Sequence, residues 1–151
     1  MYLIALSGGT TAERTEIAER LLVAAKGRLT LCAQAEVTGK GGNWDNQLEG
    51  RQAVARAHLL SESLKGLDGA CMQHHGFVVA HCLTEQEAQV VREQKGAVWH
   101  LYGKPSARVP IRLGDPIVAR TGGSFAHVIE PIEALSEYLL SVGRAKRREA
   151  C

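Results

Sequence analysis

The stretch that decides the fold is residues 2–15, YLIALSGGTTAERT. Its first five residues form a continuous apolar run, which is typical of a strand buried on both faces of a parallel sheet. The pair Gly8-Gly9 follows, and from Thr11 apolar residues recur every three or four positions, which predicts an amphipathic helix ending near Gly27. A strand, a glycine turn and a helix in this order predict a βα unit, and the backbone amides of such a turn can hold a phosphate.

The turn keeps the spacing of a phosphate-binding P-loop but not all of its residues. The motif G-x-x-x-x-G-K-[ST] has its counterpart in Gly8-x-x-x-x-Glu13-Arg14-Thr15. Arg14 keeps the positive charge of the lysine, and Thr15 keeps the hydroxyl that would bind Mg²⁺. Glu13 brings a carboxylate, and two unit charges about 4 Å apart repel by roughly 4 kcal/mol at an effective dielectric of about 20. A bound polyphosphate therefore requires Glu13 to turn outward, and an ordinary strand-to-helix turn is the competing interpretation.

The rest of the chain alternates strands with helices. Thr84 and Glu87 form a capping box at the start of one of these helices. The pattern predicts one three-layer α/β domain over residues 1–142, with a mostly parallel sheet, strand 2–6 at its centre and 143–151 as a basic tail. The further expected elements are strands at 29–35, 76–83, 97–102 and 116–120, a loop at 37–50, and helices at 51–65, 85–95 and 129–142.

Composition narrows the class of protein. The chain has 151 residues, 45% hydrophobic and 23% charged, which is typical of a globular domain with a real core. No apolar run approaches the roughly 20 residues that cross a bilayer, and no signal peptide is recognised, so we expect a cytoplasmic protein with reduced cysteines and no membrane partner. The net charge is +2. The basic residues of 144–148 are interpreted as a solvated end, in preference to a nucleic-acid contact.

Outside the turn, several side chains are candidates for a site. Lys40 and Trp44 lie in the Gly-rich segment 37–50, where they would supply a charge and a stacking face to a second anion nest. Arg51 and Arg56 could reach a phosphate from the following helix. A plain loop and solvated helix charges are the competing interpretations. His81 lies at the carboxyl end of a predicted parallel strand, where open α/β sheets bind ligands, although a structural histidine is the competing interpretation.

A zinc site is disfavoured. Cysteine and histidine side chains gather within residues 71–82, but zinc normally requires two well-spaced pairs. If 77–83 is a strand, His81 and Cys82 point to opposite faces and cannot easily serve one ion. The members of this group are Cys71, His74, His75, His81 and Cys82.

Two segments in the second half of the chain resemble the C-terminal half of the bacteriophage deoxynucleoside monophosphate kinases, and with the opening strand the resemblance covers roughly two-thirds of the chain. The resemblance is carried by VVAHCLTEQEAQVVREQKGAVWHLYGK (78–104) and PIRLGDPIVARTGGSFAHVIEPIEALSEYLL (110–140), together with the opening LIALSG. It rests on order and spacing: Glu87, the turn at Gly96, Asp115 and the turn at Thr121 sit in corresponding places. It implies a P-loop kinase fold, ATP and Mg²⁺ as cofactors, and a site formed by Ser7, Gly8, Gly9, Thr10, Thr11, Ala12, Glu13, Arg14 and Thr15, with Arg14 as the catalytic cation.

The chain departs from this family where the chemistry is done. His81 and Leu83 replace the aspartate and arginine of a family Asp-x-Arg, and the middle of the chain is shortened. Since removing one charge clamp costs on the order of 10³-fold in phosphoryl transfer, we expect transfer to be weak or lost. The leading hypothesis is a divergent nucleotide- or phosphate-binding protein. An active deoxynucleoside monophosphate kinase and an interaction protein, binding another protein or a second copy of the chain, stay open; a phage origin would put it in the host cytoplasm.

Overall fold

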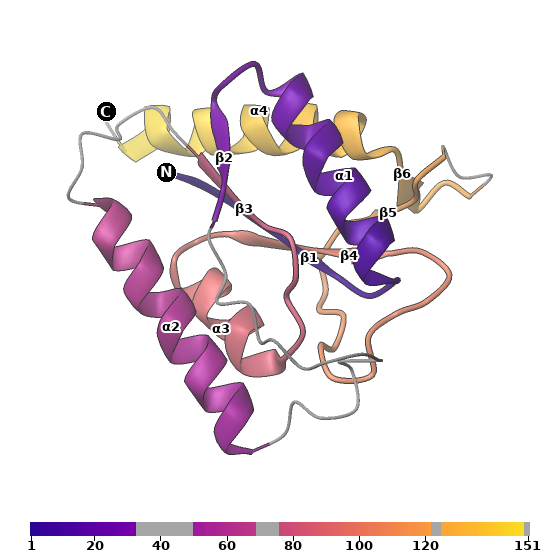
Figure 1. Cartoon of the computed structure of the whole chain (residues 1–151). Coiled ribbons are helices and arrows are strands. Elements are labelled where there is room, and N and C mark those ends of the chain that lie inside the picture. Colours follow the sequence, from indigo (N-terminus) through magenta and orange to yellow (C-terminus); the bar gives the residue numbers. More distant parts are fainter. Residues whose placement is uncertain (33–49, 69–75, 122–124, 150–151) are drawn as a thin grey trace.

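The computed structural model describes residues 1–32, 50–68, 76–121 and 125–149. Six strands and four helices alternate along this part of the chain (Figure 1). In chain order they are β1 (Tyr2–Ser7), α1 (Thr11–Ala24), β2 (Leu29–Leu31), α2 (Arg51–Asp68), β3 (Gly76–Val79), α3 (Glu85–Glu93), β4 (Ala97–Leu101), β5 (Ile117–Val118), β6 (Val128–Ile129) and α4 (Pro131–Glu149).

The strands form a single parallel sheet in the order β2-β3-β1-β4-β5-β6. The predicted central position of β1 is confirmed, because it pairs with β3 on one side and β4 on the other. In this register Ala5 lies opposite Val79, and Ser7 lies opposite His100. The protein thus has an α/β architecture, as the alternation of strands and helices in the sequence predicts.

Two pairs of helices cover the two faces of the sheet. Leu3 and Ala5 of β1 belong to the cluster beneath α2 and α3, whereas Ile4 and Leu6 belong to the cluster beneath α1 and α4. Figure 1 shows the same division into three layers, with α2 and α3 side by side on one face. The continuous apolar run of β1 is explained by this burial on both faces. Trp99 is fully buried in β4, as expected of a core residue.

The carboxyl ends of β1, β3 and β4 meet at one edge of the sheet. The chain leaves β1 toward the β3–β2 side and leaves β4 toward β5, so the direction of the connections reverses between these two strands. Ligands of open α/β sheets bind at such a reversal, outside the carboxyl ends of the strands. The glycine turn after β1 lies at this reversal.

The C-terminal elements differ from the sequence-based expectation. Residues 128–129, where the last helix was expected to begin, form β6, in which Ile129 pairs with Val118. The helix starts at Pro131 instead, since proline is suited to a first helical position that needs no amide donor. It also continues past 142 to Glu149, and its basic last turn complements the negative end of the helix dipole.

Several expected elements are shorter or lie outside the described residues. β2 ends at Leu31 and β3 at Val79, whereas longer apolar runs were expected to be strands. The loop expected at 37–50, except its last residue, and most of the turn expected at 121–124 lie outside the described part of the chain. The capping box of Thr84 and Glu87 is confirmed at the start of α3.

Candidate functional site

The turn after β1 is packed directly against the segment after β4. Gly8 and Gly9 have φ angles of 80° and 60°, a region that glycine adopts without strain. The Gly9 amide donates to the Lys104 carbonyl over 2.7 Å. A Cβ on Gly8 would lie only 2.7 Å from the same oxygen, so a glycine is required at this contact. One amide of the turn is therefore already bonded within the chain.

Glu13 folds back over the start of α1. Its carboxylate accepts from the Thr10 amide over 2.7 Å, while the Glu13 amide donates to the Thr10 hydroxyl over 3.2 Å. These two bonds make Thr10 and Glu13 a capping box, the same device as at the start of α3. The bond from the Thr10 amide is the main reason that the pKa of Glu13 lies below its ordinary value. The carboxylate thus occupies a donor that a phosphate would otherwise use.

Two amides at the start of α1 remain for a ligand. Thr11 and Ala12 are exposed, and among the described residues no acceptor bonds their backbone amides. Their positions are the first two of the helix, where amides have no partner within the helix itself. Exposed amides at a helix start favour an anion.

Arg14 is buried rather than directed into solvent, with 3% of its surface exposed. Its guanidinium donates to the carbonyls of Gly8 and Gly9 over 2.7 and 3.1 Å. It also donates to the Thr11 hydroxyl and to Nδ1 of His81, over 3.3 and 3.2 Å. Arg14 therefore stabilises the turn by donating hydrogen bonds to its carbonyl oxygens.

His81 lies between two guanidinium groups. Arg14 donates to its ring, and Nη2 of Arg56 donates to its carbonyl over 3.3 Å. Burial, with the charges of Arg14 and Arg56, lowers the pKa of His81 to about 4. The imidazole is therefore neutral near pH 7, and its Nδ1 accepts a hydrogen bond.

Arg56 also forms a buried ion pair with Glu87. Their charged atoms are 2.9 Å apart, and the side chains are 9% and 1% exposed. The other carboxylate oxygen of Glu87 accepts from the amides of Leu83 and Thr84. The pair fixes α2 to the start of α3. Arg56 lies on the same face of α2 as the buried residues Ala53, Ala57 and Leu60, which are three or four positions away along the helix or adjacent to it. Its burial could have been predicted from this spacing.

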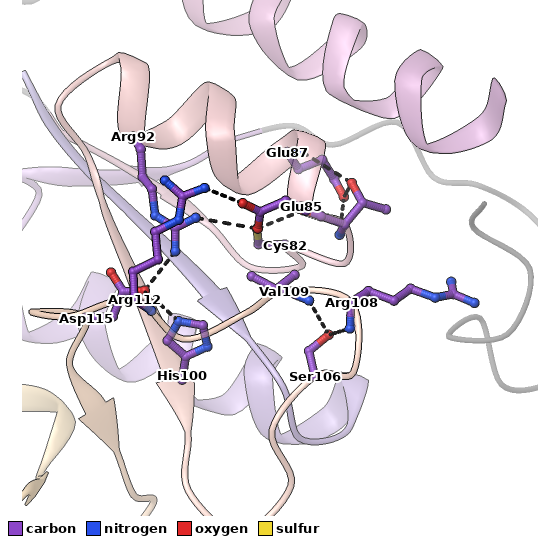
Figure 2. A network of polar contacts seen from close by, with 11 residues as sticks. Cys82, Glu85, Glu87, Arg92, His100, Ser106, Arg108, Val109, Arg112 and Asp115 are labelled. Carbon is purple, nitrogen blue, oxygen red and sulfur yellow. Dashed lines mark hydrogen bonds and ion pairs between the residues drawn. The ribbon is translucent and has the colours of Figure 1, made fainter. Parts of the chain in front are cut away.

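A polar network holds the segment after β4 against α3 (Figure 2). Asp115 accepts from Arg92 over 2.7 Å, from Nε2 of His100 over 3.0 Å and from the Arg112 amide over 2.9 Å. Arg112 also pairs with Glu85. Burial raises the pKa of Asp115, but the three bonds outweigh it and hold the pKa below its ordinary value. The resemblance pointed to Asp115 but not to these partners.

The remaining candidate residues do not join this cluster. Thr15 is exposed, and its hydroxyl donates to the Thr11 carbonyl over 2.9 Å. Arg51 is exposed at the start of α2 and lines an open hollow with Val54 and His58. Lys40 and Trp44 lie outside the described residues, as do Cys71, His74 and His75.

No metal site is found in the part of the chain that the structure describes. Cys82 is fully buried there, and burial raises the pKa of its thiol. None of the described helices is both long enough and apolar enough to cross a membrane.

Comparison with known proteins adds no relative. Neither a family model, nor a curated protein, nor a solved structure matches the chain. The resemblance to the phage kinases therefore remains a prediction from the sequence.

Proposed function

We propose that the protein binds a phosphate-bearing small molecule, a nucleotide by its resemblance to the phage kinases, with phosphoryl transfer weak or lost. One observation carries the proposal: at the carboxyl edge of the sheet the backbone amides of Thr11 and Ala12 are exposed and, among the described residues, unbonded. Arg14 and Arg56, whose guanidinium groups are bonded within the chain, add positive charge at this edge. Guanidinium groups are well suited to phosphate, and this edge is where α/β sheets hold their ligands. A cytoplasmic location, in a bacterial host if a phage encodes the chain, belongs to the same proposal.

The charges around the turn support an anion. The charges of Lys104 and Arg120 both lower the pKa of Glu13, so two further cations act on the start of α1. The exposed amides of Thr11 and Ala12 add the positive end of the helix dipole. An anion at this point would meet cations and amide donors together.

The same geometry argues against efficient transfer. A P-loop cation must reach the transferred phosphoryl group, whereas the guanidinium of Arg14 binds the carbonyls of Gly8 and Gly9. The Thr15 hydroxyl, the proposed Mg²⁺ ligand, already donates to a helix carbonyl. An active ATP-dependent kinase would have to rearrange both groups.

A non-catalytic interaction protein is the second candidate. It is favoured by a specific observation, namely that the Gly9 and Thr10 amides are bonded within the chain, to the Lys104 carbonyl and to the Glu13 carboxylate. Its partner would be another protein or a second copy of the chain.

Calorimetry with inorganic phosphate, deoxynucleoside monophosphates, ADP and ATP, with and without Mg²⁺, tests the proposal. Glu13→Gln is the informative variant, because glutamine keeps the capping bond and removes the charge. A unit charge about 4 Å away in water is worth about 1 kcal/mol, so phosphate should bind about fivefold more tightly.

The matched control is Glu19→Gln, which removes the same charge farther along α1 and should leave the affinity unchanged. Absence of binding to every compound by both the wild type and Glu13→Gln would refute the proposal and favour the interaction protein. Turnover of a monophosphate to a diphosphate would instead show an active kinase.

A further inference from the structure

The segment 103–114, here called the strap, connects β4 to β5, and Figure 2 shows its residues Ser106, Val109 and Arg112. Its backbone at 104–106 packs against the turn after β1, since it lies within 3.4 Å of the place of a Cβ on Gly8. We propose that the strap is an autoinhibitory cover, which must lift before an anion can occupy the turn after β1. The inference rests on the proposed function and concerns the regulation of that same site.

The strap and an anion compete for the Gly9 amide, and Glu13, which belongs to α1, competes with the anion for the Thr10 amide. The Lys104 carbonyl lies 2.7 Å from the Gly9 nitrogen, and a carboxylate oxygen of Glu13 lies 2.7 Å from the Thr10 nitrogen. Both are oxygen acceptors at the distance that a phosphate oxygen would take. The Gly9 amide can bond either the Lys104 carbonyl or an anion, so an anion at this amide displaces the carbonyl.

Two buried polar atoms near the turn lack hydrogen-bond partners within the described part of the chain. They are Oγ of Ser7 and Nδ1 of His100. The two residues are opposite each other in neighbouring strands, and alternation along the strands places both on the α2–α3 face. Buried polar atoms are nearly always bonded, so an unbonded pair calls for an explanation. Ser7 directly precedes Gly8, and a lifted strap would let its hydroxyl donate to an anion on the turn.

The strap has a glycine at each end and a buried apolar residue between them, an arrangement that suits motion as a unit. Gly103 and Gly114 stand at its two ends with φ angles of 91° and 93°, and no atom of the described residues lies within 4 Å of the place of a Cβ in either. Hinges that absorb a backbone rotation are a few such terminal positions. Between them Val109 is fully buried in the core cluster of Ala5 and Val98. Val109 is therefore the apolar anchor that keeps the cover closed.

The size of the effect follows from the anchor. If only the lifted form binds the anion, the apparent dissociation constant is the intrinsic constant divided by the lifted fraction. Val109→Ala removes two buried methyl groups, which should raise the lifted fraction about tenfold. Exchange of the Gly9 amide with solvent and the affinity for inorganic phosphate should then rise by the same factor.

The experiment measures both quantities on the full chain, by NMR hydrogen exchange and by calorimetry with inorganic phosphate. Val91→Ala is the matched control, since Val91 is equally buried in the same cluster but belongs to α3. If Val109→Ala does not fold, Arg112→Gln replaces it, because this change removes the ion pair that joins the strap to Glu85 of α3.

Equal increases in Gly9 exchange and phosphate affinity in the strap variant, absent from Val91→Ala, would support the inference. Faster exchange with unchanged affinity, in a protein whose wild type binds phosphate, would overturn the cover and leave the proposed function intact. Equal effects of Val91→Ala would also overturn it, since they would reflect general loosening. If neither protein binds phosphate, the inference is overturned, whereas the proposed function fails only if deoxynucleoside monophosphates, ADP and ATP do not bind either.

Ser7→Ala tests the role of the hydroxyl separately. Removing an unbonded buried hydroxyl should leave the closed protein at least as stable as the wild type, while phosphate binding should weaken severalfold. Unchanged phosphate binding in this variant would overturn the part that the inference gives to Ser7.

Discussion

Arg14→Lys separates two roles that one cation could have in the turn. If Arg14 acts as the lysine of a P-loop does, a lysine should serve as well or better, and phosphate should bind more tightly. If Arg14 holds the turn together through its carbonyls, a lysine should destabilise the protein. The structure supports the second role, because the guanidinium is buried and bonded to the turn.

The magnitude follows from the bonds that a lysine cannot keep. The single ammonium of lysine can at best retain the carbonyls of Gly8 and Gly9, which Arg14 binds at 2.7 and 3.1 Å. It would lose the bonds to the Thr11 hydroxyl and the His81 ring, at 3.3 and 3.2 Å. Hydrogen bonds to charged groups contribute about 1.5–3 kcal/mol each, and these two are long, so the expected loss is about 2–3 kcal/mol. That loss corresponds to a decrease in Tm of about 5–10 °C.

Urea denaturation followed by Trp fluorescence measures the free energy of unfolding. Its slope with urea should stay unchanged, since the surface exposed on unfolding is the same. Arg144→Lys, at an exposed position near the end of α4, is the matched control and should change stability by less than about 0.5 kcal/mol. Wild-type stability of Arg14→Lys together with tighter phosphate binding would show that Arg14 is the P-loop cation and refute the clamp.

Three further predictions concern the same fold. The pKa of His81 is about 4 in the folded protein and about 6.5 in the unfolded chain, so the unfolded chain binds more protons between these pH values. The free energy of unfolding should therefore fall by about 1–2 kcal/mol from pH 7.5 to 4.5, solvent screening included. Urea denaturation of His81→Gln should show a flatter dependence of this free energy on pH. Tyr138→Phe should cost about 1–3 kcal/mol in the same assay, because the tyrosine hydroxyl bonds both the amide and the carbonyl of one β1 residue, whereas Tyr102→Phe, at an exposed ring, should cost almost nothing. Gly8→Ala should lower the thermal midpoint more than Gly27→Ala, since their φ angles are 80° and 81° but only Gly8 faces a backbone oxygen; equal midpoints would contradict the contact with the strap.

Much of the fold could be predicted because its signals are local. The apolar run of β1, the periodicity of α1 and the capping box at Thr84 each reside in a few consecutive residues. β6 was missed because it has only two residues, Val128 and Ile129, and is defined by pairing with β5 rather than by its own pattern. Such a strand is set by tertiary contacts, which a single sequence does not display.

The site could be predicted only in part. The spacing from Gly8 to Thr15 located the turn, and the strand end located His81, but the partners of these residues come from distant segments. The Lys104 carbonyl, which follows β4 along the chain, accepts from the Gly9 amide, and Arg56 donates to the His81 carbonyl from α2. From the sequence, a bound polyphosphate required the Glu13 side chain to turn outward. In the structure the Glu13 carboxylate accepts a hydrogen bond from the Thr10 amide.

The two departures from the P-loop motif make one physical unit. Backbone amides and carbonyls in a tight turn must be bonded, by a ligand, by water or by the chain itself. Here the carboxylate of Glu13 satisfies an amide that a phosphate would take, and the guanidinium of Arg14 satisfies the two glycine carbonyls. A glycine and a lysine at these positions would leave the amide to a ligand and give the carbonyls a smaller, less multidentate partner. Glu13 therefore supplies within the chain an acceptor of the kind that a phosphate offers to a P-loop amide, whereas Arg14 supplies donors that an anion could not give to the carbonyls. An anion that enters the turn has to compete with the Glu13 carboxylate for the Thr10 amide.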